Sequence, residues 1–422
     1  MEPTNRTIRP LTQQDLEAYL DIYLNAYPAY KTLDEACREH YREKHRLELR
    51  EDRQVQTVGL FEGDVLIATM KLILFSMNCF GRMQTACGLM ALEVHPLHKK
   101  QGAALEMIRY FEDYARRHGA LLTLLLPFQI SFYRRMGYGF AGKLYEYHLP
   151  TAVLPKPEGE ARRHLRLLQP EDFDRVLACH SRFATQNHGM VEKFEEEVRA
   201  ARTDVQVRRI GYCADDGTLR GYVAYRFESA SDTNYTRNRL SVEELVYDDG
   251  VVLRALLGAL KLQEDLAQTV LLRTGEEDFH HLLEDPQDVS GNYIDYGFLQ
   301  TNVSAIGTMF KLLDPAAFVT ATAYRTLPQG TLTAAFCYRD EMAHRDCRTV
   351  LRFDGGHWSA LSEEAPAEVT VTCRQGDLAS LLMASCGLES MVRLGAVAVT
   401  GPWQQLAQLL HYGQKPWLNS DY

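Results

Sequence analysis

The segment Leu89-Met90-Ala91-Leu92-Glu93-Val94-His95-Pro96-Leu97-His98-Lys99-Lys100-Gln101-Gly102-Ala103 decides how the first third of the chain folds. It begins as a strand-like run, breaks at His95-Pro96 and leads into a helical stretch over 105–117. Small residues at a helix N-terminus leave free backbone N–H groups at the positive end of the helix dipole, which suits phosphate. Lys99 and Lys100 would add positive charge at the rim. The alternative is an ordinary strand-to-helix connection with solvated lysines.

A second informative segment begins at Leu121. Its continuous apolarity predicts a buried strand over 121–126. The chain then reads Phe128-Gln129-Ile130-Ser131-Phe132-Tyr133-Arg134-Arg135-Met136-Gly137-Tyr138, a turn rich in aromatic residues. The two segments are therefore predicted to lie on neighbouring strands of one sheet.

The opening of the chain is repeated further on. Thr7-Ile8-Arg9-Pro10-Leu11 and Leu165-Arg166-Leu167-Leu168 both read as a short strand before a helix, and predicted hairpins follow at 57–68 and 210–225. The same order of elements twice indicates two copies of one α/β domain. A linker rich in Pro, Glu and Arg joins them over 150–163.

The pattern changes after Asp314-Pro315. Short strand-like runs appear at 331–338, 349–353 and 368–373, and helices are predicted from Asp377 and from Thr400-Gly401-Pro402-Trp403. This region is predicted to be a third, α+β domain. Its apolar residues Leu381, Leu382 and Met383 fit either core packing or a lipid tunnel.

Composition narrows the class of protein. The 422 residues carry a net charge of −10, which disfavours nucleic acid as a partner because phosphate contacts need a basic face. No apolar run suggests a membrane span, and the N-terminus has no apolar signal core, so a cytoplasmic location is expected. The nine Cys are scattered singly, so neither a disulfide framework nor a metal site is expected.

Taken together, the two decisive segments resemble the GNAT acetyltransferases. In that family a Val-x-Pro-x-x-x-x-x-Gly-x-Ala/Gly phosphate loop follows the fourth strand, and a Phe-Tyr-x-x-x-Gly-Tyr/Phe turn follows the fifth. The full length resembles the enhanced-intracellular-survival acetyltransferases, which implies a fold of two tandem GNAT-like domains followed by a sterol-carrier-protein-like α+β domain. The expected boundaries are 1–150 for the catalytic domain, 151–310 for a degenerate copy and 311–422 for the third domain.

This resemblance implies acetyl-coenzyme A as the acyl-donating substrate. Backbone groups at 92–94 would hold its pantetheine arm in a gap between strands, and 100–105 would hold the pyrophosphate. The expected binding residues are Leu92, Glu93, Val94, Lys99, Lys100, Gln101, Gly102, Ala103, Ala104, Leu105 and Phe128.

The resemblance also implies a general acid and a general base. Tyr133 stands where the family places a tyrosine that protonates the leaving thiolate, although packing of the turn is the alternative; Tyr138 is a weaker candidate. Related enzymes use the C-terminal carboxylate of an aromatic residue as the base, and this chain ends in Tyr422 where Phe is usual. If the terminal carboxylate is not the base, Glu93 is the next candidate.

The second copy is predicted to bind no coenzyme A. The segment that corresponds to its phosphate loop carries Asp248-Asp249, whose charges would repel a pyrophosphate. Other acidic groups, Asp34-Glu35 and Glu195-Glu196-Glu197, are expected to be solvated helix faces, with attraction of cations as the alternative.

The predicted function is transfer of an acetyl group to primary amines. By resemblance these are aminoglycoside-like, polyamine-like or lysine acceptors, and the protein is expected to be a homo-oligomer, a hexamer in the family. A different class of function, a non-catalytic acyl-coenzyme A or lipid carrier, is left open by the third domain. Neither the acceptor nor the acyl chain length can be read from the motifs.

Overall fold

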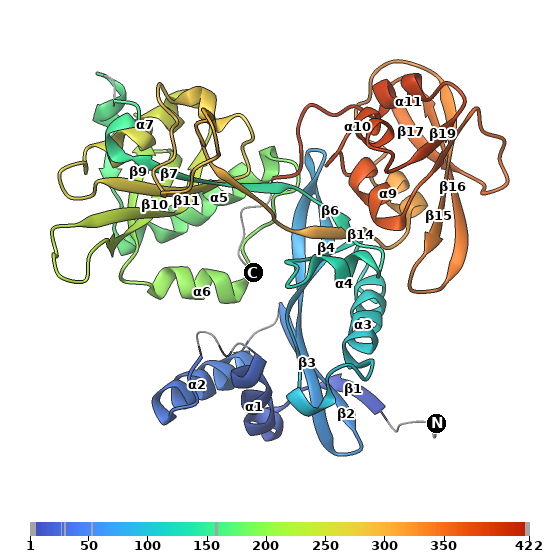
Figure 1. The fold of residues 1–422 in the computed structure, drawn as a ribbon, viewed down its shortest axis with the longest axis horizontal. Coiled ribbons are helices and arrows are strands. Elements are labelled where there is room, and N and C mark those ends of the chain that lie inside the picture. Colours follow the sequence, from blue (N-terminus) through green and yellow to red (C-terminus); the bar gives the residue numbers. More distant parts are fainter. Residues whose placement is uncertain (1–5, 27, 29–30, 52–53, 157–158, 418–422) are drawn as a thin grey trace.

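The protein is described by a computed structural model that covers residues 6–26, 28, 31–51, 54–156 and 159–417. These residues form three lobes (Figure 1). Each of the first two lobes contains a seven-stranded sheet, and the third contains a five-stranded sheet. The predicted sequence of two α/β units and an α+β unit is therefore confirmed.

The first sheet is antiparallel except between β4 and β5, which run parallel. In spatial order its strands are β1 (Arg6–Pro10), β2 (Val55–Glu62), β3 (Val65–Cys79), β4 (Arg82–Val94), β5 (Leu122–Leu125), β14 (Met309–Leu312) and β6 (Gly139–Phe140). Its helices are α1 (Leu16–Ala26), α2 (Glu35–Glu51), α3 (Ala103–Arg117) and the short α4 (Ile130–Arg134).

Alternation along β3 assigns the helices of the first lobe to their faces. Met70 and Leu72 pack in a core cluster with Met107 and Phe111 of α3. Lys71, which lies between them in the sequence, instead forms an ion pair with Glu48 of α2. One face of the sheet is thus apolar beneath α3, whereas the face toward α1 and α2 holds buried polar groups.

The second sheet repeats this order of strands. Its members are β8 (Leu165–Leu167), β9 (Arg208–Cys213), β10 (Leu219–Ser229), β11 (Asn238–Tyr247), β12 (Thr269–Thr274), β7 (Lys143–Pro150) and β13 (Val303–Ile306). Its helices are α5 (Phe173–Gln186), α6 (Glu195–Thr203) and α7 (Gly250–Lys261). Both copies open with the same turn, in which Asp15 or Asp172 completes a capping box before α1 or α5.

The two copies exchange one strand with each other. β7 follows β6 in the chain but crosses into the second sheet, where it lies between β12 and β13. β14 follows β13 but returns to the first sheet, between β5 and β6 (Figure 1). The expected boundary at residue 150 therefore falls at the end of a strand of the second sheet, and the one at residue 310 falls within a strand of the first.

The third lobe is an α+β unit, as its sequence predicts. Its strands are, in spatial order, β17 (His357–Leu361), β16 (Arg345–Asp354), β15 (Leu332–Asp340), β18 (Val369–Thr372) and β19 (Ala398–Thr400). Its helices are α8 (Pro315–Ala321), α9 (Gln375–Leu382), α10 (Leu388–Arg393) and α11 (Trp403–Leu410). Leu381, Leu382 and Met383 lie in the apolar core, so core packing accounts for them.

Helix α9 attaches the third lobe to the first. Arg134 at the end of α4 forms an ion pair with Asp377 of α9, at 2.8 Å. A Cβ on Gly139 would lie 1.8 Å from the carbonyl oxygen of Gly376, so only glycine permits this approach. The turn that carries Tyr133 is thus fixed from two sides, by its own sheet and by the third lobe.

No described helix is long and apolar enough to cross a membrane. All nine cysteines are free thiols.

A buried ion pair holds the exchanged strand β14 in the first sheet. Lys311 Nζ lies 2.8 and 3.0 Å from the two carboxylate oxygens of Glu112 on α3 and donates to the Met136 carbonyl at 2.9 Å. Lys311→Met would leave the Glu112 carboxylate buried and unpaired. The variant should lose about 3–5 kcal/mol of unfolding free energy in urea titrations.

The double variant Lys311→Met, Glu112→Leu is the control for this prediction. It removes both charges, so it should recover much of the lost stability. Equal stability of the single variant and the native chain would contradict a structural role for the pair.

Candidate active site

Strand β4 carries a bulge where it separates from its neighbour. Ala91 has a φ of 52°, rare for a residue with a side chain, and the pairing register with β3 shifts at this point. The pairing of β4 with β5 ends at Leu89 and Leu125, while β4 continues to Val94. After Leu89, the backbone groups of β4 that point away from β3 therefore have no strand partner on the side where β5 has ended. That this gap holds an extended ligand arm stays a prediction.

The N-terminus of α3 is open. Gly102 is the N-cap residue with a φ of 85°, and no side chain caps the first turn. The first N–H groups of the helix, at Ala103, Ala104 and Leu105, therefore lack the side-chain acceptor that most helices supply. These N–H groups are suited to bind an anion. A residue with a Cβ would be strained at Gly102 because φ is positive there.

The loop before α3 is exposed and basic. Lys99, Lys100 and Gln101 are all exposed, and Lys100 has a positive φ of 63°. Arg6 of β1 donates a hydrogen bond to the Gln101 carbonyl at 3.1 Å and so ties this loop to β1. The predicted phosphate loop thus has the geometry that its sequence suggests; its ligand stays a prediction.

Glu93 lies just after the bulge and is a buried carboxyl group with a raised pKa. The residue is 2 % exposed. Its Oε2 accepts a hydrogen bond from Thr69 Oγ1 at 3.1 Å, and within the described chain its Oε1 has no partner. Burial raises the pKa of Glu93 to about 8, against the opposing effects of the Thr69 hydrogen bond and the charge of Lys31. This carboxyl can therefore exchange a proton near neutral pH.

Glu93 belongs to a buried group that we call the first polar cluster. Its members are Tyr19, His45, Glu48, Lys71, Glu93 and Glu196. Lys71 Nζ lies 2.9 Å from Glu48 and 3.4 Å from Glu196, and Lys44 Nζ lies 3.3 Å from Glu196, so two lysines pair with these two carboxylates. Glu196 comes from α6 of the second copy, so both copies build the cluster.

Several buried atoms of this cluster lack hydrogen bonds. Among the described residues, Tyr19 Oη, His45 Nε2, Glu48 Oε1 and Glu93 Oε1 have no partner. A buried polar atom without a partner costs about 1–3 kcal/mol, so several of them in one place indicate a site that a polar ligand or water completes. The cluster lies on the α1 and α2 face of β4, opposite α3.

This cluster does not follow from the sequence, and one of its members lies where the sequence pattern does not predict it. Glu195-Glu196-Glu197 was expected to be a solvated helix face; Glu195 is exposed, but Glu196 is buried against Lys71 and Glu197 pairs with Lys193 at 2.6 Å. Lys71 and Glu196 are far apart in the sequence, and no local pattern relates them. Asp34-Glu35 is exposed, as expected.

Tyr133 is buried in the apolar core beside Phe132 and Tyr138. Burial raises its pKa to about 12, so the phenol keeps its proton at neutral pH. Within the described residues its hydroxyl makes no hydrogen bond. The Tyr138 hydroxyl, in contrast, is sealed in the core and accepts from Thr123 Oγ1 at 3.2 Å. Tyr133 thus remains the better placed of the two phenols to meet a ligand.

Phe128, expected near the ligand arm, is 92 % exposed on the loop before α4. Tyr422 lies outside the described residues, which end at Trp417. The tail before it does return to the first two lobes. Trp417 is buried against Phe183 and Tyr247, and its backbone N–H donates to the His188 carbonyl at 2.7 Å.

The second copy has equivalent features, but they are already satisfied. Asp249 caps α7, where its carboxylate accepts from the N–H groups of Val251 and Val252 at 2.9 and 3.0 Å. The carboxylate thus occupies the position that an anion would take at α3. Asp249 would thus block this site because its own carboxylate caps the helix; that coenzyme A is excluded here stays a prediction.

A carboxylate also follows the bulge of β11. Glu244 lies 3.0 Å from Lys193 and 3.5 Å from His180. Burial raises the pKa of Glu244, but the charges of Lys193 and His180, together with nearby hydrogen-bond donors, bring this pKa below its ordinary value. Glu244 is therefore a permanently ionised partner in an ion pair, unlike Glu93.

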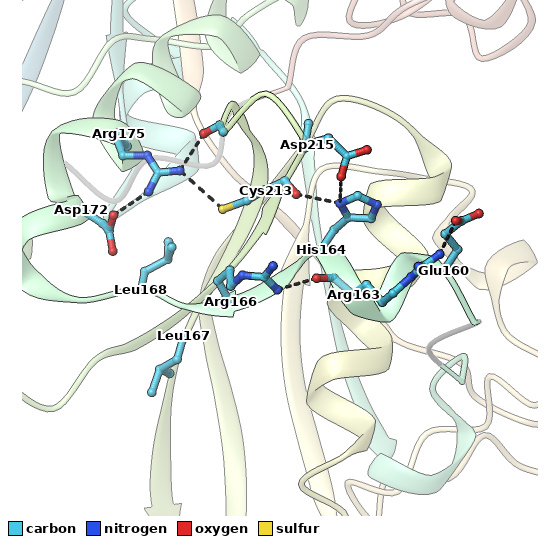
Figure 2. A pocket seen from close by; sticks show the side chains of 12 residues that line it. Glu160, Arg163, His164, Arg166, Leu167, Leu168, Asp172, Arg175, Cys213 and Asp215 are labelled. Carbon is cyan, nitrogen blue, oxygen red and sulfur yellow. Dashed lines mark hydrogen bonds and ion pairs between the residues drawn. The ribbon is translucent and has the colours of Figure 1, made fainter.

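A pocket of about 660 Å³ lies elsewhere in the second copy, beside β8 and the turn between β9 and β10 (Figure 2). Its charged groups are engaged with one another: Arg175 donates to Asp172 and to the Gly217 carbonyl, and His164 contacts the Cys213 carbonyl. None of the predicted binding residues lines it. The described residues also contain no group of three His, Cys, Asp or Glu that could hold a metal ion.

Comparisons with known proteins agree with this arrangement. Residues 7–141 and residues 189–299 match two different sequence profiles, each described as an acetyltransferase (GNAT) domain. No curated protein matches the chain.

Solved structures match over 99% of this chain. A probable N-acyltransferase from Enterococcus faecalis V583 has a TM-score of 0.80 at 16% identity and is covered completely. A GCN5-related N-acetyltransferase from Kribbella flavida has a TM-score of 0.75 at 19% identity over 98% of its length. Eis1 from Mycobacterium abscessus has a TM-score of 0.75 at 19% identity and is also fully covered. At these identities the likeness establishes a shared fold.

The contrast between the two helix N-termini predicts one coenzyme A per chain. Gly102→Val puts a β-branched residue at a positive φ and should weaken binding about tenfold or more, because one or two charge-assisted hydrogen bonds are lost. Titration calorimetry with coenzyme A measures both the stoichiometry and the affinity.

Asp249→Ala is the matched control at the other N-cap. It should reduce stability by about 1 kcal/mol and leave coenzyme A affinity unchanged. Two sites per chain, or equal losses of affinity in both variants, would contradict the assignment.

Proposed function

Because the chain contains two GNAT acetyltransferase domains and is an acetyl-coenzyme A-dependent acyltransferase, we propose that it acetylates primary amines at the first domain. The observation that carries this proposal is Glu93, a buried carboxyl with an unpartnered oxygen directly after the β4 bulge. An acceptor ammonium must lose a proton before its nitrogen can attack a thioester carbonyl. A carboxyl with a pKa of about 8 is suited to take that proton.

The proposed binding of the donor uses the residues of the phosphate loop. Backbone N–H groups at 103–105 hold the pyrophosphate, Lys99 and Lys100 supply point charges at the rim, and β4 at 92–94 offers main-chain partners to the pantetheine arm. The acetyl thioester brings the activated acyl group. The open cap at Gly102 and the unpaired edge of β4 support this fit.

The proposed chemistry is direct transfer. Glu93 accepts one proton from the acceptor ammonium, and the amine nitrogen forms the new C–N bond with the thioester carbonyl carbon. The nitrogen then loses its second proton to water, and the C–S bond breaks. Tyr133 donates its phenolic proton to the departing thiolate or stabilises its charge. The pKa of about 12 keeps this proton in place until negative charge develops beside it.

The terminal carboxylate of Tyr422 is the second candidate for the base. The resemblance to the enhanced-intracellular-survival enzymes suggests it, and the fold shared with Eis1 is in keeping with it. The buried position of Trp417 brings the tail to the junction of the first two lobes. The same resemblance favours aminoglycoside-like, polyamine-like or lysine acceptors.

Replacement of Tyr133 tests the general acid. Tyr133→Phe keeps the packed ring and removes the hydroxyl, so kcat should fall about 10²–10⁴-fold with little change in stability. Release of free thiol from acetyl-coenzyme A in the presence of a panel of amines measures this. Tyr138→Phe is the matched control and should retain activity while losing about 1 kcal/mol of stability through its hydrogen bond to Thr123.

Thiol release also separates the enzyme from a carrier. A chain that binds acyl-coenzyme A or lipid but releases no thiol with any amine would refute the transferase proposal.

The pH dependence of kcat distinguishes the two bases. A base must be ionised to accept a proton, so if Glu93 is the base, kcat at saturating acceptor should rise with pH and level off above about 8. Glu93→Gln should then lower kcat about 10²–10⁴-fold and abolish this rise. If deletion of Tyr422 abolishes turnover while Glu93→Gln retains it, the terminal carboxylate is the base instead.

A further inference from the structure

A lysine side chain is enclosed by aromatic rings next to the first polar cluster. Lys31 Nζ lies 3.4 Å from the ring centroid of Tyr23 and 5.0 Å from that of Tyr41. The two rings are 5.0 Å apart, and His45 contacts the Tyr23 ring with centroids 4.5 Å apart. We call Tyr23 and Tyr41 the aromatic cage. Such an arrangement attracts an ammonium group through the negative faces of the rings.

The cage is electrostatically coupled to Glu93. Burial lowers the pKa of Lys31 to about 8, and the charge of Glu93 opposes this effect. The charge of Lys31 in turn lowers the pKa of Glu93. The charges of the ammonium in the cage and of the Glu93 carboxyl therefore influence each other inside the first lobe.

The surroundings of the cage are incomplete. His45 Nε2, Tyr19 Oη and Glu93 Oε1 are buried beside it, and no described residue bonds to them. Lys31 is only 7 % exposed, so its ammonium is held away from water although these neighbouring atoms stay unsatisfied. A cationic ligand with further N–H groups would fit this environment better than a single lysine does.

We propose that Tyr23 and Tyr41 form the subsite for the second ammonium group of a diamine acceptor, and that Lys31 occupies this subsite until the acceptor displaces it. The inference rests on the proposed function, since it assumes that the first amino group of the acceptor meets Glu93. The side chain of Lys31 is then an internal competitor, and it selects for acceptors with two cationic groups.

Calorimetric binding of 1,4-diaminobutane, without an acyl donor, tests the competitor. Lys31→Ala empties the cage and should bind the diamine about tenfold more tightly than the native chain, the factor of one desolvated cation–π contact. Adding Tyr23→Leu should cancel this gain. 1-Aminopentane, in which a methyl group replaces the second ammonium, should gain little.

Two control variants separate occupation of the cage from net charge. Lys31→Met removes the charge but keeps an unbranched stem in the cage, and Lys44→Ala removes a charge from α2 outside it. Neither should gain affinity. If both gain as much as Lys31→Ala, the effect is one of charge alone and the subsite is refuted; so is it if Lys31→Ala binds like the native chain.

Labelling of the native chain provides a test that needs no variant. A pulse of acetic anhydride followed by peptide mass spectrometry should modify Lys31 several times faster in saturating 1,4-diaminobutane than in the same concentration of 1-aminopentane. Lys44 should be labelled equally in both. Equal labelling of Lys31 would overturn displacement, whereas failure of the acetyltransferase proposal would appear separately, as absent thiol release.

Discussion

The reciprocal exchange of β7 and β14 is the constraint on which the rest of the structure depends. Each sheet lacks one strand until the other copy supplies it, so neither copy is a complete fold alone. Without β14, the first sheet would have a gap between β5 and β6, the two strands that are connected by the turn carrying Tyr133. The buried contact of Lys311 with Glu112 and with the Met136 carbonyl fixes β14 to both α3 and this turn. The exchange therefore sets the relative positions of α3 and the Tyr133 phenol.

The two copies show how one fold can hold an open site and a closed one. Both have a bulged strand followed by a carboxylate and a helix, but the carboxylate and the helix N-terminus differ between the copies in whether an internal partner is present. Asp249 caps α7 whereas Gly102 leaves α3 open, and Lys193 neutralises Glu244 whereas Glu93 has no cation in hydrogen-bonding contact among the described residues. In the second copy, internal partners occupy the positions where a ligand would bind.

Sequence reasoning predicted the features that depend on neighbours along the chain. The connection from β4 to α3, the hairpins and the opening turn of each copy follow from periodicity, turn residues and caps. The strand exchange could not be predicted, because no local pattern in the eight residues of β7 or the four of β14 indicates which sheet each strand joins. The first polar cluster was missed for the same reason: α6 brings Glu196 to Lys71 from the other copy. Burial, which no local pattern reveals, also sets the pKa of Glu93 and of Tyr133.

Glu93 presents a conflict between stability and chemistry. Its raised pKa means that the folded chain holds this proton more tightly than the unfolded chain does, so Glu93 increasingly opposes folding as the pH rises from its ordinary pKa toward about 8. In the second copy, Lys193 lies 3.0 Å from the Glu244 carboxylate and so relieves the same conflict there. In the first copy Lys71 lies nearby on the adjacent strand but pairs with Glu48 and Glu196 instead. The lysine of the polar cluster thus pairs with Glu48 and Glu196, and Glu93 keeps only the hydrogen bond from Thr69; under the proposed mechanism, the lack of a cationic partner is what allows this carboxyl to exchange a proton.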